Sequence, residues 1–198
     1  MKRWISFAVV ALAVAEVLLV LMSWLLSATM TEDVRSLLSS EGVRWFFGSF
    51  TTMLAKPWLV WLLLLSMGSG CLWKSGLSAI FSRRSAPVTY RERVALRLVI
   101  TLIVLYVSII ILLTAIPHAM LLSATGRLFP SAFSRALLPV ITFGIIFISC
   151  VYGIVSGRFA SLADAVASLS FGIATAAPLF LLYILAAQFY ESLRFVFL

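Results

Sequence analysis

The chain has 198 residues, of which 63% are hydrophobic and 11% are charged, and its formal net charge is +8. Soluble domains carry about 25% charged residues, so this composition excludes an ordinary soluble protein. It also argues against a nucleic-acid-binding protein, because the basic residues lie between apolar segments and leave no soluble basic surface for phosphates.

Apolar runs of roughly 18 or more residues recur along the chain, and each is long enough to cross a bilayer. In lipid the backbone must satisfy its own hydrogen bonds, so such runs form helices. The sequence therefore predicts an all-α polytopic membrane protein with about five transmembrane helices and an interfacial helix. We expect a single transmembrane domain over residues 1–198.

The first span is expected from Trp4 to Leu26. Its start, Met1-Lys2-Arg3 followed by an apolar run and small residues, is similar to a signal peptide. The apolar run continues beyond Glu16 to Leu26, however, which favours an uncleaved transmembrane helix whose N-terminus is cytoplasmic.

Glu16 falls near the middle of this first span. A charged group at that depth costs about 2.5–3.5 kcal/mol or more, so it normally faces protein or water. One interpretation is a proton or ligand site. The other is a protonated or hydrogen-bonded glutamate at a helix interface or beside a partner subunit. The second is favoured, because the sequence offers no other intramembrane charge as a relay partner.

The next segment, residues 31–42, is polar, and Val43–Phe50 combines aromatic residues with flanking charges, which is typical of an interfacial helix. A short second span is expected from Pro57 to Trp73. Near its end, Gly68 and Gly70 either unwind the helix or allow close helix contact.

The segment from Lys74 to Arg93 is rich in lysine and arginine, which predicts a cytoplasmic loop. The third span is expected from Ala95 to Ile116, with Arg97 close enough to its cytoplasmic end to extend into the interface. Residues 117–135 are expected to form a loop.

The fourth span is expected from Ala136 to Val155, with Pro139 in its first turns and Gly157 ending it. Ser161 and Asp164 then predict a helix start, with the serine as the cap and the aspartate in the first turn.

Phe171–Phe189 is expected as the fifth span, kinked at Pro178, and Tyr190–Leu198 as an interfacial tail. Five crossings from a cytoplasmic N-terminus place the C-terminus outside.

Metal, cofactor and catalytic sites are not expected. Cys71 and Cys150 lie in apolar stretches without metal-ligand spacing, so we interpret them as small buried hydrophobic residues. His118 is the single histidine and falls in a predicted loop, so a histidine-based metal cluster cannot form within one chain. Without a nucleophile–base pair, an enzyme is not predicted.

Several motifs resemble the AbgT family of aminobenzoyl-glutamate transporters. The first block runs from Ser40–Trp45 through Met67–Leu77 and includes Gly68, Gly70, Ser75 and Gly76. Trp73 departs from the family, which has an acidic residue at that place.

A second block of the resemblance follows the family's order and spacing. It begins with Arg91-Glu92-Arg93 at the entry to a span. It continues through three short segments, namely Val151–Gly157 with Tyr152, Gly153 and Gly157, then Asp164–Val166, and then Ala186–Phe189 with Gln188.

The resemblance covers most of residues 40–198, but this chain lacks the two helical hairpins and the substrate region of the family. What remains is similar to the scaffold helices that form the dimer core of those transporters. The resemblance therefore implies a bacterial inner-membrane scaffold or accessory subunit, present as a homodimer or within a larger membrane complex. Two alternatives stay open: the static half of a split transporter, and a small oligomeric ion or proton pathway that uses Glu16.

Overall fold

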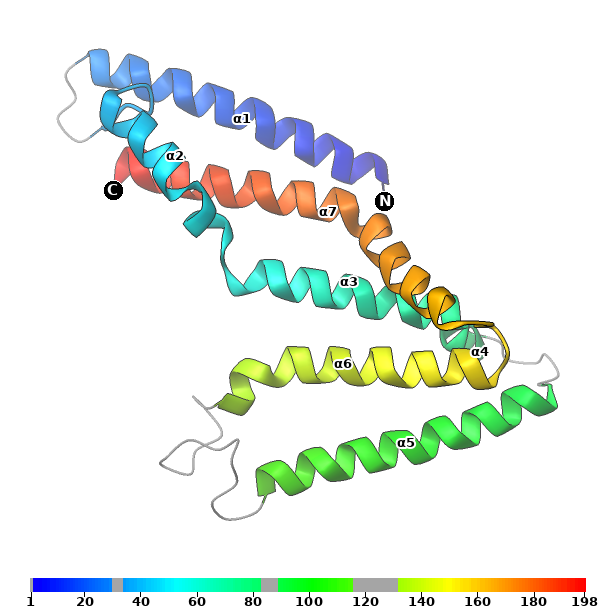
Figure 1. Cartoon of the computed structure of the whole chain (residues 1–198). Helices are drawn as coiled ribbons and strands as arrows, with labels where there is room; N and C mark the ends of the chain where they lie inside the picture. Colours follow the sequence, from blue (N-terminus) through cyan, green and yellow to red (C-terminus); the bar gives the residue numbers. More distant parts are fainter. Residues whose placement is uncertain (1, 30–33, 83–88, 116–131) are drawn as a thin grey trace. The chain divides into compact units, whose positions relative to one another are not determined.

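The computed structural model describes residues 2–29, 34–82, 89–115 and 132–198 (Figure 1). Every regular element in these ranges is an α-helix. The helices are α1 (Lys2–Ala28), α2 (Ser40–Leu54), α3 (Pro57–Ser75), α4 (Leu77–Ser82), α5 (Tyr90–Ala115), α6 (Ala132–Val155) and α7 (Leu162–Phe197). Among the described residues, five helices are long and apolar enough to cross a membrane: α1, α3, α5, α6 and α7. The all-α polytopic class is confirmed.

Several predicted boundaries were wrong. The segment between Lys74 and Arg93 contains the short helix α4, and α5 already begins at Tyr90. Residues 132–135, predicted as loop, belong to α6, while the rest of the 117–135 segment, His118 included, lies outside the described residues. Hydropathy marks the apolar part of a helix, whereas the polar turns that extend it carry no such signal.

Helix α7 joins two features that the sequence analysis treated separately. The helix start at Ser161 and the span expected at Phe171 are one continuous helix, which also includes most of the predicted tail up to Phe197. Pro178 lies inside it, and the α-helix continues on both sides. Ser161 precedes the helix, and its hydroxyl oxygen accepts the backbone N–H of Asp164 at 3.4 Å, as predicted for the cap. Asp164, in the first turn, accepts backbone N–H bonds from Ala160 (2.8 Å) and Ser161 (3.0 Å) in return.

The described residues divide into two compact units. The first comprises residues up to Leu62 together with Ala176–Leu198, and the second comprises Leu63–Thr175. The first unit therefore contains α1, α2, the start of α3 and the C-terminal part of α7. The second contains the rest of α3, α4, α5, α6 and the start of α7.

In the first unit, α1 lies beside the C-terminal part of α7 (Figure 1). Glu16 meets Ser192, and three residues farther along each helix Leu19 and Phe195 share one buried cluster. The two helices therefore run in the same direction. The backbone N–H of Arg35 donates to the Val196 carbonyl at 3.1 Å, which holds the chain after α1 against the end of α7.

Helix α2 begins at an N-cap and covers this contact. Ser39 accepts the backbone N–H of Gly42 at 3.0 Å, which satisfies a donor of the first turn. Trp45 stacks on Phe195 of α7 with ring centroids 4.3 Å apart. The predicted helix at Val43–Phe50 is thus present, and it is longer than predicted at both ends.

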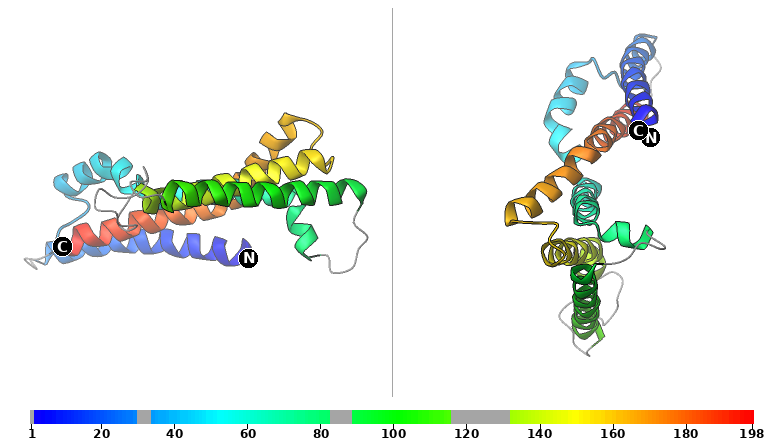
Figure 2. Two further views of the ribbon diagram at one scale, coloured as in Figure 1. Left: turned by 90° about the horizontal axis from the view of Figure 1, so that it is seen from below. Right: turned by 90° about the vertical axis from the view of Figure 1, so that its right-hand side faces the viewer.

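In the second unit, α5 and α6 lie side by side in each view (Figures 1 and 2). The Tyr106 ring of α5 packs on Gly144 of α6, and its hydroxyl donates to the Val140 carbonyl at 2.7 Å. Pro139 was expected in the first turns of its span, but α6 begins at Ala132, so the proline lies about two turns inside the helix.

Candidate functional site

A chain of polar side chains joins α1 to α7 in the first unit. The Ser192 hydroxyl donates to Glu16 Oε1 at 2.6 Å, and Gln188 Nε2 lies 3.5 Å from Ser192 Oγ. Ser192 and Gln188 are both buried, and they lie one helical turn apart on the same face of α7. The site therefore links two residues that were predicted independently, Glu16 from its depth and Gln188 from the family resemblance.

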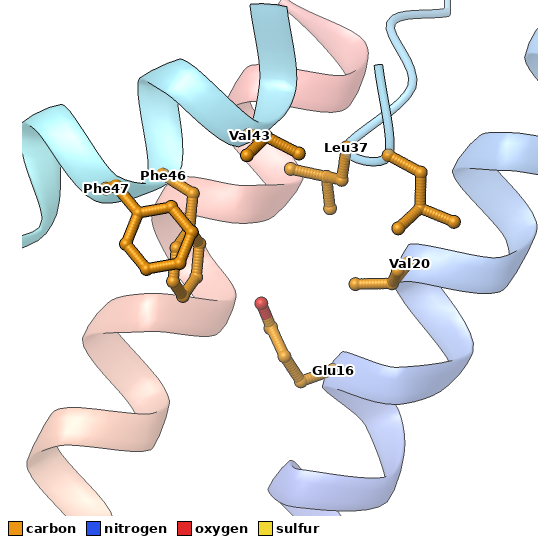
Figure 3. A pocket seen from close by; sticks show the side chains of 7 residues that line it. Glu16, Val20, Leu37, Val43, Phe46 and Phe47 are labelled. Carbon is orange, nitrogen blue, oxygen red and sulfur yellow. The ribbon is translucent and has the colours of Figure 1, made fainter. Parts of the chain in front are cut away.

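The second carboxyl oxygen of Glu16, Oε2, is buried and has no hydrogen-bond partner among the described residues. The Glu16 side chain borders a cavity of about 150 Å³. Figure 3 shows this side chain extending from α1 toward α2. Its neighbours around the cavity are apolar: Val20, Leu37, Leu38, Val43, Phe46 and Phe47. The site is thus a carboxyl group in apolar surroundings, with Ser192 hydrogen-bonded to one of its two oxygens.

An ion pair between Lys56 and Glu191 lies next to the polar residues Gln188 and Ser192 on α7. Lys56, between α2 and α3, lies 2.5 Å from Glu191 Oε1, and its ammonium faces the Tyr190 ring at 5.4 Å from the centroid. Sequence reasoning identified neither Ser192 nor Lys56 as a partner. The four-residue spacing of Gln188 and Ser192 was the available signal for Ser192. Nothing in the sequence relates Lys56 to Glu191, which is 135 positions away.

A second candidate region is a close crossing of α3 and α7 in the second unit. Ser66 and Gly70 of α3 face Ser168 and Gly172 of α7, so each helix presents small residues four apart. A Cβ atom on Gly70 would overlap the Gly172 backbone, and a Cβ atom on Gly172 would overlap the Ser66 carbonyl. Helix α3 remains helical through Gly68 and Gly70. The two glycines therefore allow close helix contact, and they do not unwind the helix.

Helix α3 also packs on α6 in this unit. A Cβ atom on Gly68 would lie 3.1 Å from a Thr142 methyl group. Cys71 is fully buried, and its Sγ lies 3.4 Å from Cys150 Sγ without a covalent bond. Cys71 is buried as expected, whereas Cys150 is only partly buried, and nothing in the sequence indicated that the two form a pair.

The remaining residues of the family resemblance shape the turns of the second unit. Gly76 and Gly157 have φ angles of +78° and +79°, a conformation that favours glycine, and Gly157 ends α6 as predicted. Gly153 leaves room for the Phe159 ring, and Tyr152 is fully buried. The buried Ser75 hydroxyl donates to its own helix at Leu72 (3.1 Å). These positions stabilise helix junctions.

The described ranges contain no group of three or more His, Cys, Asp or Glu side chains that could hold a metal ion. Comparisons with models of protein families, with curated proteins and with solved structures found no match. The fold therefore defines only the class of the protein, which is a multi-pass α-helical membrane protein.

Proposed function

We propose that this chain is a non-catalytic scaffold or accessory subunit of the membrane, which associates with itself or with other membrane subunits. The observation that carries the proposal is the crossing of α3 and α7 at Gly70 and Gly172. Close glycine contacts of this kind favour one fixed helix arrangement, because either backbone would have to move to admit a side chain.

The buried hydroxyl groups of the second unit support a structural role. Thr142 donates to the Leu138 carbonyl at 2.7 Å, and Ser168 donates to the Ala165 carbonyl at 2.6 Å. Both bonds return to the helix of the donor. These hydroxyl protons are therefore engaged within the scaffold and are not directed at a ligand.

The resemblance to AbgT transporters supports the same proposal. Gly68, Gly70, Gly76, Gly153 and Gly157 are family-like, and in the structure they lie at helix contacts and turns of the second unit. In the family such helices belong to the dimer core. The chain would then act as a homodimer or as a subunit of a larger complex in a bacterial inner membrane.

The static half of a split transporter is a more specific form of this proposal. In that form a separate chain supplies the helical hairpins, and substrate sites in secondary transporters are typically built from such broken helices. A second candidate function, an oligomeric ion or proton pathway, is supported by Glu16 Oε2, which is buried without a partner among the described residues.

Two measurements on the full-length chain test the proposal. Subunit counting and cross-linking in native membranes should give a dimer or a larger complex, and identification of copurified chains separates self-association from a split transporter. Purified protein in liposomes should show no uptake of aminobenzoyl-glutamate above empty vesicles. A monomer in native membranes would contradict the scaffold proposal, and so would saturable, proton-dependent uptake by the lone chain.

A further inference from the structure

A polar cavity of about 360 Å³ opens in the second unit where α3 ends and α7 begins. Two cationic side chains line it, Lys74 from the last turn of α3 and Arg158 from the turn after α6. Asp164, Ser168 and Phe171 of α7 form another part of the wall. The proposed scaffold function does not use this cavity.

Lys74 brings an ammonium group with unused donors to the cavity. Its Nζ lies 4.7 Å from the centroid of the Phe171 ring, a cation–π contact that leaves its N–H bonds available. Among the described residues no carboxylate lies within ion-pair distance of it. Lys74 can therefore donate to an anion without giving up an existing ion pair.

Arg158 is held in place beside the same cavity. Its guanidinium packs over Gly76, where a Cβ atom would overlap it, and the positive φ of Gly76 independently favours glycine there. The ion pair with Glu92 is long, with 3.7 Å between Nη2 and Oε1. Arg158 has five N–H donors, so this pair leaves donors for a second acceptor.

Asp164 is the one carboxylate among the described residues of the cavity wall, and its Oδ2 already accepts the backbone N–H groups of Ala160 and Ser161. Its charge is therefore directed at the start of α7. Within the cavity wall the two cations, Lys74 and Arg158, exceed it by one positive charge, and Glu92, which pairs with Arg158 at 3.7 Å, lies outside that wall. Two cations on one wall suit an anion with several oxygen acceptors.

Exposed aromatic side chains accompany the two cations. Trp73, next to Lys74, is 75% exposed, and Phe171 in the cavity wall is 40% exposed. An exposed tryptophan at the end of a spanning helix is typical of the level of lipid headgroups. A free phosphate ion would make no favourable contact with these aromatic side chains, whereas the acyl chains of a lipid would cover them.

We propose that the cavity binds the phosphate group of an anionic phospholipid, with Lys74 and Arg158 as donors and the acyl chains along Phe171. Basic pockets between spanning helices are established headgroup sites in membrane proteins. The lipid would join the end of α3 to the turn between α6 and α7 through one shared ligand.

Native mass spectrometry of the purified full-length chain in detergent tests this proposal. Phosphatidylglycerol, phosphatidylcholine and inorganic phosphate are titrated separately onto the wild type. We expect retention of phosphatidylglycerol well above that of phosphatidylcholine, and no displacement of it by millimolar phosphate. Equal retention of the two lipids would overturn the proposal, and displacement by inorganic phosphate would replace the lipid with a free-anion site.

Variants assign the binding to the two cations. Lys74→Gln and Arg158→Gln should each weaken retention of phosphatidylglycerol about fivefold, the effect of one interfacial charge. Lys74→Arg should restore it. Arg44→Gln removes an exposed charge from α2 in the first unit and should leave retention unchanged. A comparison of elution profiles and melting curves excludes misfolding, and equal losses in Lys74→Gln and Arg44→Gln would overturn the assignment to this cavity.

Discussion

Ser192 donates a 2.6 Å hydrogen bond to Glu16 across the contact between α1 and α7 in the first unit. The two residues are 176 positions apart in the chain. The bond is therefore a polar link between two predominantly apolar helices. It supports the interpretation of Glu16 as a hydrogen-bonded residue at a helix interface.

Removal of the Ser192 hydroxyl should weaken this contact. Ser192→Ala leaves Glu16 Oε1 without its donor in this part-buried contact, which should lower the free energy of unfolding by about 1–3 kcal/mol. Glu16→Gln should preserve the fold because an amide oxygen still accepts the bond. Denaturation in mixed micelles measures both effects, and Ser170→Ala, an exposed position on the same helix, serves as the matched control.

A double-mutant cycle separates this bond from general packing. Glu16→Leu alone leaves the Ser192 hydroxyl without its acceptor, whereas Glu16→Leu combined with Ser192→Ala removes both partners. The double variant should therefore lose less stability than the sum of the two single variants. Strictly additive losses would mean that the bond contributes nothing to the fold.

The crossing of α3 and α7 should not tolerate a methyl group. Gly172→Ala places a Cβ atom on the Ser66 carbonyl, and overpacking of this kind costs about 1–3 kcal/mol. Gly48→Ala is the matched control, because a Cβ atom there meets nothing within 4 Å and the substitution should stabilise α2 by about 0.5–1 kcal/mol. Thermal unfolding in detergent measures both, and equal behaviour of the two variants would refute the close crossing.

The two cysteines should form an intramolecular disulfide under mild oxidation. Their sulfur atoms are 3.4 Å apart, and a disulfide bond is about 2.05 Å long, so a small side-chain movement suffices. Diamide takes up the two electrons and two protons released by Cys71 and Cys150. We expect the intact mass to fall by two hydrogens and maleimide labelling under denaturing conditions to be lost. Cys150→Ser should abolish both changes, and cross-linking only between chains would contradict the observed pairing.

The topology prediction can be tested by cysteine labelling in intact cells. In a background with Cys71→Ser and Cys150→Ser, Ser85→Cys should resist an impermeant maleimide, because the basic segment around it is predicted to be cytoplasmic. Thr51→Cys, on the exposed surface of α2, should react from outside. The parallel run of α1 and the end of α7 agrees with an odd number of crossings. Labelling of Ser85→Cys but not Thr51→Cys would reverse the orientation.

The sequence alone determined the class of the protein and the approximate positions of its spans. Apolar length is a property of consecutive residues, so it can be read without knowledge of any neighbour. Local signals were equally informative: Gly157 ends α6 and Ser161 caps α7 as predicted, because both act within one turn of the chain. The depth of Glu16 likewise identified a polar residue that needs a partner.

Only the tertiary structure decided which residues those partners are. Ser192 meets Glu16, Gly172 meets Gly70, and Cys150 meets Cys71, because two packed helices fix their rotation and relative height together. In a chain that is apolar almost throughout, hydropathy does not distinguish a helix face that meets protein from one that meets lipid. The small residues that permit close approach mark such a face only when the partner helix is known.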